Sequence, residues 1–460
     1  MEYTVTFLEV EYERLTHHLF DDATTERAAY LLCRLSRTPL ETRLLVRDVI
    51  TVAAEDVLDA STNHMSVHSR SYLRAMKAAN ERGEAFVFVH SHPAGYPEHS
   101  SQDDVEEKPL FRTAYHRIHA DVVHASLVLS EPGRPVGRVW LEDGSVHPVK
   151  RIRVVGDRVR IYQESIREAV VPAHLDRQVR AFGRATQLVL GELTVGLVGV
   201  GGTGSAVFEE LVRLGVGRII IADPEELDPT NVNRVYGSRL ADAGMPKIEI
   251  AERTAVDIGA GTIVTAMQQP ISFASVLKQF RECDVIFGCT DDEWGRSLLT
   301  RFAIFYCIPV FDMGVEIDSE SGVITSIQGR VTTLMPTRAC LYCRNRISLE
   351  RVRAETMRAF NPAEAEALRA EGYAPELAEP SPAVIPFTTT VAATAITELL
   401  HRLTGFLGSE RKSSEVLHIF SQTRVRTNDR AASPDCLCGQ QHYWGLGDVE
   451  PFLDLIWRPE

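Results

Sequence analysis

The 460-residue sequence contains little lysine. Its 49 basic residues include only six lysines, so the other 43 are arginines and a lysine at a motif position stands out. Acidic residues outnumber basic ones, and the formal net charge is −14. This balance argues against a nucleic acid or an anionic membrane surface as the main partner.

Cysteines and long apolar runs are also scarce. Eight cysteines are too few for a disulfide scaffold of this length, and in a cytosolic protein they indicate metal ligands or buried thiols. No apolar run reaches about 18 residues, which excludes a transmembrane helix. The N-terminal segment is acidic and lacks a secretory signal pattern. We therefore expect a cytoplasmic protein with neither nucleic acid nor membrane as a partner.

Length and patterning predict two α/β domains, residues 1–165 and 166–460. In the first, Ala23–Leu35 predicts a helix running into a strand, and Glu84–Pro93 predicts a buried strand stopped by proline. In the second, Leu193–Asp223 has the order strand, glycine turn, helix, strand. This βαβ pattern indicates a parallel, doubly wound sheet.

Two histidines mark the end of the predicted strand in the first domain. His90 and His92 alternate along an extended backbone, so both imidazoles project to one side and can reach one metal. Asp103, at the start of the next helix, can supply a third ligand. Three protein ligands and an open fourth position are what a catalytic zinc site needs. Hydrolysis also requires a carboxylate that accepts the water proton and a donor that faces the oxyanion.

The spacing of these residues resembles the JAMM (MPN-type) metalloproteases. Their pattern is an upstream glutamate, His-x-His, seven residues and Ser-x-x-Asp, and seven residues separate His92 from Ser100 in this chain. The resemblance implies that His90, His92 and Asp103 bind zinc. It further implies Glu26 as the general base and Ser100 as the oxyanion donor.

This resemblance covers roughly residues 1–150 and leaves alternatives open. Glu41 competes with Glu26 as the upstream acid, and Asp104 with Ser101 gives a shifted version of the motif. A surface loop with histidines by chance and an inactive pseudo-enzyme are the remaining interpretations.

A glycine-rich turn opens the second domain. Gly199–Ser205 follows a predicted strand and begins a helix, where the backbone can approach phosphate and the helix N-terminus favours negative charge. The glycines concerned are Gly199, Gly201, Gly202 and Gly204. Asp223, about twenty residues further on at a strand end, would hold a ribose. To this point a nicotinamide dehydrogenase fits equally well.

Three further elements favour a triphosphate over a hydride donor. Asn231 and Arg234 follow the second strand, Lys247 stands at the head of a helix, and Asp291 lies at the end of a later strand. Cationic side chains and a carboxylate-held magnesium in one crevice suit ATP chemistry. Charge developing on the α-phosphate needs those cations.

Over about residues 170–445 this set resembles the ubiquitin-activating superfamily, close to MoeB and ThiF. Asp223, Glu225, Asn231 and Arg234 match its Asp-x-Asp…Asn-x-x-Arg pattern. By resemblance, Asp223 holds the ribose, phosphates are bound by Asn231, Arg234 and Lys247, and Asp291 holds magnesium. Arg177 would reach a neighbouring subunit's site, which implies a homodimer. Two positions depart from the pattern, namely Val235 and Asp292.

Four of the eight cysteines form two close pairs that are far apart in the sequence. Cys340 and Cys343 form Cys-x-x-Cys, whereas Cys436 and Cys438 form Cys-x-Cys. Two such pairs indicate a structural four-thiolate zinc site, which the MoeB-like family has in these two places. The shorter second pair leaves a metal-free turn as the alternative.

A crossover loop is predicted at about residues 344–385. Many activating enzymes carry a catalytic cysteine there, but residues 344–435 contain none. This absence argues against a thioester and favours transfer of an acyl adenylate to a partner's nucleophile. Hydroxyls such as those of Ser381 and Thr388 could accept an acyl group, although nothing in the sequence selects them.

The two resemblances together imply a bifunctional enzyme of a ubiquitin-like system, as in bacterial pathways often linked to defence. One half would trim precursors or undo conjugates, and the other would adenylate the C-terminal glycine of a ubiquitin-like protein. A conjugating enzyme would be a further partner. The first alternative is a sulfur-carrier adenylyltransferase of thiamine- or molybdopterin-type biosynthesis, with a sulfurtransferase partner. The second is a non-catalytic binder of ubiquitin-like tails.

Overall fold

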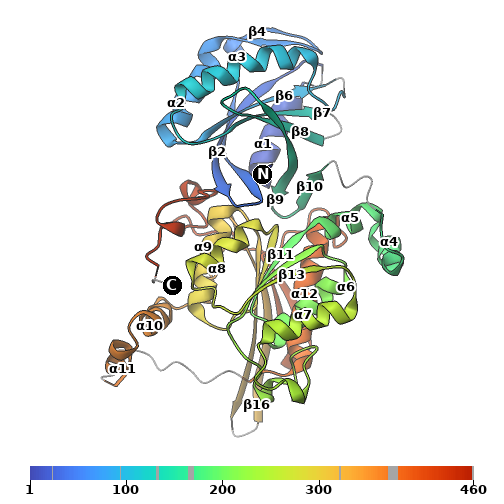
Figure 1. The fold of residues 1–460 in the computed structure, drawn as a ribbon, viewed down its shortest axis with the longest axis vertical. Coiled ribbons are helices and arrows are strands. Elements are labelled where there is room, and N and C mark those ends of the chain that lie inside the picture. Colours follow the sequence, from blue (N-terminus) through green and yellow to red (C-terminus); the bar gives the residue numbers. More distant parts are fainter. Residues whose placement is uncertain are drawn as a thin grey trace. The chain divides into compact units, whose positions relative to one another are not determined.

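The chain divides into two compact units in the computed structural model (Figure 1), and each is described by itself. One unit comprises Met1–Ser165 with two short segments, Phe305–Cys307 and Trp444–Val449, and the other comprises the remainder. The structure describes residues 1–22, 24–93, 95–130, 134–163, 170–320, 323–370 and 382–457. Within these ranges no helix is both long and apolar enough to cross a membrane.

The first unit is built on an eight-stranded sheet with the order β1-β3-β2-β6-β7-β8-β9-β10. A further pairing of β1 with β9 joins the first strand back to the seventh. A separate hairpin is formed by β4 and β5. The elements are β1 (Glu2–Leu8), α1 (Glu9–Phe20), β2 (Ala28–Arg37), β3 (Glu41–Thr51), β4 (Val57–Ala60), β5 (Met65–Val67), α2 (Ser69–Arg82), β6 (Ala85–His92), α3 (Ser101–Arg117), β7 (His124–Ser130), β8 (Arg134–Trp140), β9 (Val146–Val155) and β10 (Val159–Gln163).

Helices cover both faces of this sheet (Figure 1), and its central strands β2, β6 and β7 are buried on both sides. Alternate residues of β6 divide between two cores: Val87 and Val89 face the core beneath α1, whereas Phe86 packs with α2 and α3. Continuing this alternation places His90 and His92 on the α2/α3 side.

The prediction of a helix at the start of Ala23–Leu35 is wrong. Thr24 and Thr25 form a turn, no helix is present among the described residues 24–27, and β2 begins at Ala28. The Asp22 carboxylate accepts hydrogen bonds from the Thr24 amide and from the hydroxyls of Thr24 and Thr25. Such local side-chain bonds stabilise a turn in competition with a helix.

The second unit contains another eight-stranded sheet, in the order β13-β12-β11-β14-β15-β16-β17-β18. Its first five strands are parallel and its last three antiparallel, and β18 lies at one edge. The elements are α4 (Asp176–Phe182), α5 (Arg184–Glu192), β11 (Thr194–Val198), α6 (Gly202–Arg213), β12 (Arg218–Ala222), α7 (Lys247–Ile258), β13 (Ile263–Met267), α8 (Ala274–Gln279), β14 (Val285–Gly288), α9 (Glu293–Tyr306), β15 (Val310–Glu320), β16 (Val323–Leu334), α10 (Leu349–Phe360), α11 (Pro362–Ala370), α12 (Ile385–Thr404), β17 (Glu415–Ile419) and β18 (Arg424–Asn428).

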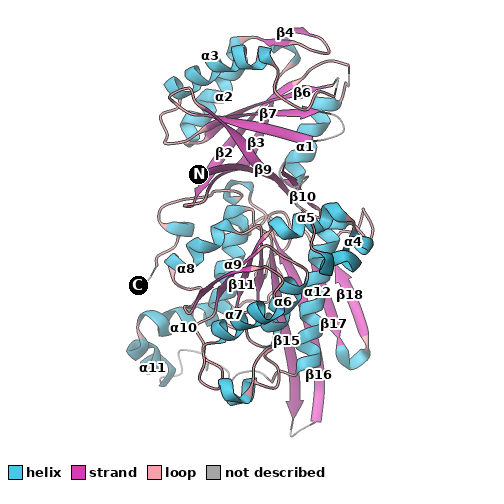
Figure 2. Ribbon diagram, turned by 45° about the vertical axis from the view of Figure 1, so that its right-hand side comes forward, coloured by secondary structure: helices cyan, strands magenta, loops and turns pink. Residues whose placement is uncertain are grey.

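The parallel half has the doubly wound arrangement that the sequence predicts. Figure 2 shows α8 and α9 on one face of the sheet and α6, α7 and α12 on the other. The strand order reverses between β11 and β14, which are adjacent and parallel. Ligands of open α/β sheets bind at such a switch point, beyond the carboxyl ends of the strands. The turn at Gly199 and the segment containing Asp291 both follow strands at this point.

Candidate active sites

Three side chains converge at the end of β6 in the first unit. The Nε2 atoms of His90 and His92 are 3.0 Å apart, and the Asp103 carboxylate lies 3.3 Å from the first and 3.8 Å from the second. Both imidazoles are buried. Donors about 2.1 Å from one tetrahedral zinc would be about 3.4 Å from one another, so the observed separations fit the ion.

The electrostatics of this cluster also suit a cation. Burial and the neighbouring His90 lower the pKa of His92, which favours the neutral imidazole that a metal requires. Burial alone would raise the pKa of Asp103, but His90 and the Ser100 amide and hydroxyl hold it well below its ordinary value. Asp103 is therefore an anion that faces both histidine rings.

Ser100 is the N-cap of α3 and forms a capping box with Asp103. Its hydroxyl donates to Asp103 Oδ2 at 2.8 Å and accepts from the Asp103 amide at 3.2 Å. A hydroxyl has one proton, so the predicted oxyanion role requires the Ser100 hydroxyl to turn away from the carboxylate.

Strand register distinguishes the two candidate general bases. Glu26 lies two residues before Ala28, which pairs with His90, and burial raises the pKa of Glu26 to about 7. Glu41 begins β3, beside the opposite end of β2. That end is about 30 Å from Ala28 along the strand. There the Glu41 carboxylate accepts from Thr4 at 2.8 Å and from Arg43 at 3.0 Å. Of these two acids, Glu26 is the one close to His90.

The structure does not bring together the shifted version of the motif, in which Asp104 and Ser101 replace Asp103 and Ser100. Asp104 is exposed and forms an ion pair with Arg138, whereas the Asp103 carboxylate faces His90 and His92. The structure therefore brings together the unshifted set. The roles of these residues as ligands, base and oxyanion donor stay predictions.

The glycine turn of the second unit has the backbone shape that phosphate binding needs. Gly199 has φ +86°, and a Cβ there would lie 3.0 Å from the Cys289 carbonyl oxygen. A Cβ at Gly204 would lie 1.9 Å from the Gly199 oxygen, so only glycine permits this close packing. Gly201, by contrast, faces open space. The N-terminus of α6 is thus accessible to an anion.

Two acidic residues and Lys247 gather beyond β12. Asp223 is buried and accepts from the Val200 amide at 2.7 Å and from the Glu225 amide at 2.8 Å. Burial raises the pKa of Asp223, although these hydrogen bonds oppose the shift. The buried Lys247 at the start of α7 forms an ion pair with Glu225.

Arg234 extends across the start of α6. A Cβ at Gly202 would lie 3.1 Å from its side chain, and its guanidinium donates to the Thr230 oxygen at 2.8 Å. The backbone carbonyl of Asn231 accepts from the Arg234 amide at 3.0 Å. Asp291 is exposed just after β14, next to the β11 turn. These predicted residues therefore share one edge of the sheet.

Arg177 lies away from the phosphate-binding edge of the sheet in its own chain. It lies exposed on α4, and its neighbour Gln178 donates to the oxygen of Arg213 at the far end of α6. The twelve residues of α6 separate that end from the glycine turn by about 18 Å. A contribution of Arg177 to a partner's site stays a prediction.

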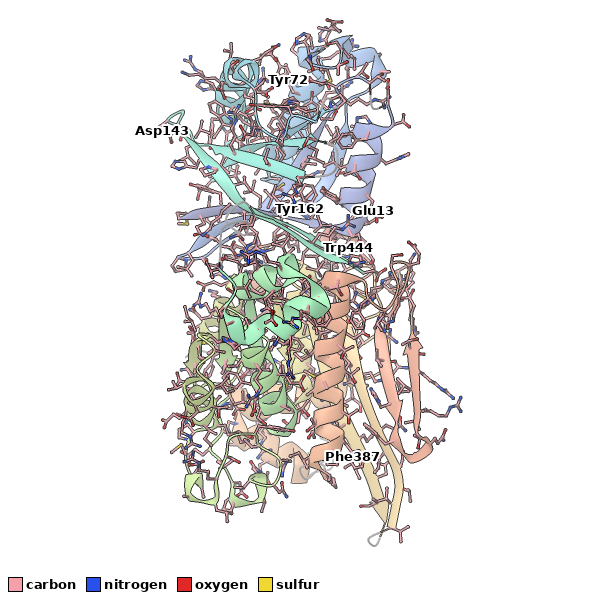
Figure 3. The ribbon with its side chains drawn as sticks, turned by 90° about the vertical axis from the view of Figure 1, so that its right-hand side faces the viewer. Glu13, Tyr72, Asp143, Tyr162, Phe387 and Trp444 are labelled. Carbon is pink, nitrogen blue, oxygen red and sulfur yellow. The ribbon has the colours of Figure 1, made fainter. Side chains whose placement is uncertain are left out.

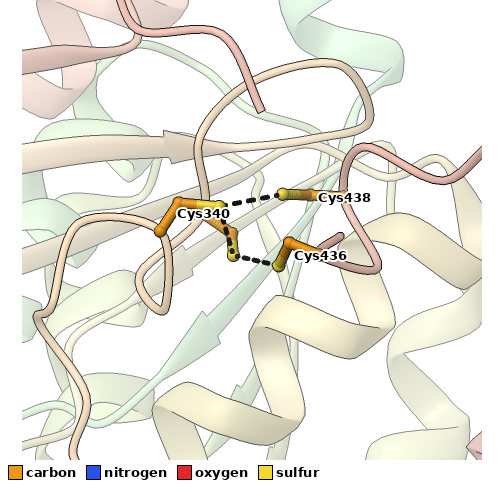
Figure 4. Close-up of side chains that lie close together, drawn as sticks. Cys340, Cys436 and Cys438 are labelled. Atoms are coloured by element: carbon orange, nitrogen blue, oxygen red, sulfur yellow. Dashed lines mark hydrogen bonds between the residues drawn. The ribbon is translucent and has the colours of Figure 1, made fainter. Parts of the chain in front are cut away.

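The four predicted zinc cysteines lie together (Figure 4). Cys340 Sγ is 3.9 Å from Cys343 and 3.5 Å from Cys436, and Cys343 is 3.5 Å from Cys438. Thiolates bound to one tetrahedral zinc lie about 3.8 Å apart, so this cluster fits the ion as well. The Cys-x-Cys spacing of the second pair does not prevent convergence.

The predicted crossover segment begins with helices docked near Asp291. The Ser348 amide donates to the Glu293 carboxylate at 2.6 Å, and Glu355 of α10 accepts from the Trp294 amide at 2.7 Å. Trp294 also contacts the ring of Phe360, with 6.0 Å between centroids. No pattern in the sequence predicts this anchoring of α10 on the N-terminus of α9.

The other end of the crossover leads into α12, where Figure 3 labels Phe387. Of the two hydroxyl residues named above as able to accept an acyl group, Ser381 lies outside the described residues. The buried Thr388 hydroxyl donates to the Ile385 oxygen at 3.0 Å. A groove of about 580 Å³ runs beside this part of α12, lined by Tyr236 and threonines of the helix. Tyr236 is two residues beyond Arg234.

Comparison with known families agrees with this geometry. A family model described as the ThiF family matches residues 175–440, more than half of the chain. The chain belongs to the ThiF family. A second model, described as prokaryotic homologs of the JAB domain, matches residues 9–140. The predicted fusion of a JAB-type domain with a ThiF domain is confirmed, and the dehydrogenase interpretation is set aside.

Individual relatives of this ThiF-family chain are distant. A tRNA threonylcarbamoyladenosine dehydratase of Bacillus subtilis is 38% identical over 92 residues, covering 20% of this chain and 36% of that protein. A ubiquitin-like modifier-activating enzyme 5 of Drosophila persimilis is 25% identical, covering 37% and 46%. The chain thus spans under half the length of these relatives. A crystal structure of E. coli MccB with MccA-N7isoASN has 15% identity and a TM-score of 0.47, covering 58% of this chain and 76% of that one.

Proposed function

We propose that the chain is a bifunctional enzyme of a ubiquitin-like system. The JAB-type unit would hydrolyse the bond that follows a C-terminal glycine, as a zinc-dependent peptidase or isopeptidase. The ThiF unit would use ATP to adenylate the glycine carboxylate that this cleavage exposes. The similarity to an enzyme that activates ubiquitin-like modifiers supports the second activity.

For the peptidase, His90, His92 and Asp103 would hold zinc, which would supply an acidified water and polarise the scissile carbonyl. Glu26 would accept the water proton, because a carboxylate with a pKa near 7 is suited to move a proton at neutral pH. It would then return that proton to the leaving amine. Ser100, released from Asp103, would donate to the oxyanion.

For the adenylation, the amides at the start of α6 would bind phosphate while Asp223 holds the ribose. Arg234 and Lys247 would neutralise the charge that develops as the glycine carboxylate attacks the α-phosphate and pyrophosphate leaves. Asp291 would hold magnesium. The tail would approach along the groove beside Tyr236, since that residue lies two positions after Arg234 in the same loop.

One observation carries this proposal: a single chain holds two separate convergent clusters, the His90–His92–Asp103 cluster and the phosphate-binding edge of the ThiF sheet. Their chemistries are complementary, because one releases a terminal carboxylate and the other consumes one.

The test is ATP–pyrophosphate exchange by the full chain, with small proteins that end in a double glycine and are encoded beside this gene. We expect exchange to require the intact tail and to fall about 100-fold or more in Asp291→Ala. Asp257→Ala removes an exposed carboxylate from α7 and is the matched control, which should exchange normally. Wild-type exchange by Asp291→Ala would contradict the nucleotide site.

A further inference from the structure

The His90 ring lacks the hydrogen bond that usually orients a metal-binding histidine. Such residues normally donate their second ring N–H to a carboxylate, a carbonyl or water. In this chain His90 Nδ1 is buried and has no partner among the protein groups described. Three rings contact His90 instead: Phe88 stacks on it at 5.3 Å and 25°, while His92 meets it edge-on at 4.8 Å and 63° and His99 edge-on at 6.4 Å and 75°.

His99 is itself held by polar contacts on the side away from solvent. Its side chain is 11% exposed, and its Nε2 lies 3.2 Å from Ser126 Oγ and 3.9 Å from Glu107 Oε1. Ser126 donates its single proton to Glu107 Oε2 at 2.6 Å, so its oxygen accepts from His99. These contacts select the Nε2–H tautomer of His99 and fix the plane of its ring.

Glu107 is the centre of a buried polar cluster that joins three elements. Arg138 Nε and Trp140 Nε1 of β8 each donate to Glu107 Oε2 at 2.9 Å, and Ser126 reaches it from β7. Glu107 stands four residues after Asp103 on α3, so the two carboxylates share one face of that helix. The helix that supplies a metal donor therefore also anchors His99.

We infer that His99 is a positioning residue of the metal site. Through Ser126 and Glu107, the β7 and β8 strands fix the His99 ring, and that ring fixes His90 by packing where a hydrogen bond would ordinarily do so. The Nε2 lone pair of His90 then stays aimed at Asp103 and His92. This inference rests on the proposed zinc site and assigns His99 no contact with the metal or the substrate.

The test is a chelator-competition titration of zinc on the full chain. His92→Ala provides the reference in which only the cysteine site binds. We expect His99→Ala to weaken the affinity of the histidine site by about 10- to 100-fold. Ser126→Ala removes the acceptor for His99 together with one donor to Glu107, and it leaves the His99 ring in place. It should therefore weaken zinc affinity in the same direction by a smaller factor. The Ser126→Ala variant also leaves the Glu107–Arg138 ion pair intact. It replaces His99→Ala as the test variant if His99→Ala does not fold.

His124→Ala is the matched control. His124 is a fully buried histidine at the opposite end of β7, where it accepts from the Phe86 amide at 3.1 Å. Its loss should lower the melting temperature without changing zinc affinity. Wild-type zinc affinity in folded His99→Ala, or in Ser126→Ala if the former does not fold, would overturn the inference. A wild-type chain that binds zinc only at the cysteines would overturn the proposed metal site as well.

Discussion

The two candidate zinc sites are assembled in opposite ways. His90, His92 and Asp103 come from one strand end and the following helix, within 14 consecutive residues. The cysteine cluster unites two segments, with Cys340 and Cys436 separated by 96 positions. A local cluster needs little more than strand alternation and a helix cap, whereas the distant one requires the second unit to be folded.

Donor number and surroundings indicate what each cluster is for. Three protein donors leave a coordination position for water, and a carboxyl group whose pKa lies near 7 stands beside them. Four thiolates fill a tetrahedral ion and leave no place for a substrate. We therefore expect the histidine cluster to govern turnover and the cysteine cluster to govern stability.

The largest expected effect belongs to His92→Ala. With two donors left, the histidine site should lose its zinc, so the chain should hold one zinc per molecule in place of two. Cleavage of a substrate with a glycine before the scissile bond should fall about 1000-fold or more, whereas ATP–pyrophosphate exchange should continue. Metal analysis and the two assays test this expectation. Cleavage that survives in the variant would refute the assignment of His92.

Glu26→Gln should have the next largest effect on cleavage, and it would separate loss of the general base from loss of a zinc ligand. Because it removes a base and not a ligand, we expect a 10²- to 10⁴-fold fall in kcat with both zincs retained. In the wild type, Glu26 must be ionised to accept a proton. Cleavage should therefore decrease about tenfold per pH unit on the acid side of its pKa of about 7. The charge of zinc would move this midpoint lower.

Glu98→Gln is the control for this prediction, because Glu98 is an exposed acid on the loop between the same metal donors. It should leave both the rate and the pH profile unchanged. A wild-type profile that stays flat down to the pH at which the chain unfolds would count against Glu26 as the base.

Cys436→Ser should have the smallest effect on turnover. Loss of one thiolate should release the second zinc and lower the melting temperature of the ThiF unit by about 5–10 °C. Cleavage should be unaffected, because its donors belong to the other unit. Calorimetry measures the melting temperature and metal analysis measures the zinc content. His92→Ala is the control, because it should leave the melting temperature of the ThiF unit unchanged. An unchanged melting temperature would show that the cysteine cluster does not stabilise the ThiF unit.

The same contrast explains how much the sequence could predict. Proximity of His90, His92 and Asp103 follows from strand alternation and spacing, and the βαβ pattern predicts the doubly wound sheet. Choosing between Glu26 and Glu41 required the register of β2 against β3 and β6. That register depends on long-range pairing.

The surroundings of the metal site were beyond a single sequence. The contacts of His99 come from β7 and α3, so no spacing of residues near His99 in the sequence predicts them. The docking of α10 on α9 through Glu355 likewise joins segments 61 positions apart. The error at Ala23–Leu35 has a local cause, because Asp22 side-chain bonds outweigh the helical tendency of the residues that follow.

The edge strand β18 is a place at which a second chain could add to the sheet and start aggregation. An exposed strand at the end of a sheet offers unpaired backbone groups to any other chain. Arg424 and Arg426 alternate with Val425 along this strand, and all three are exposed. A second copy of the strand would bring like charges together on pairing, so the arginines help to keep the sheet from growing beyond its eight strands.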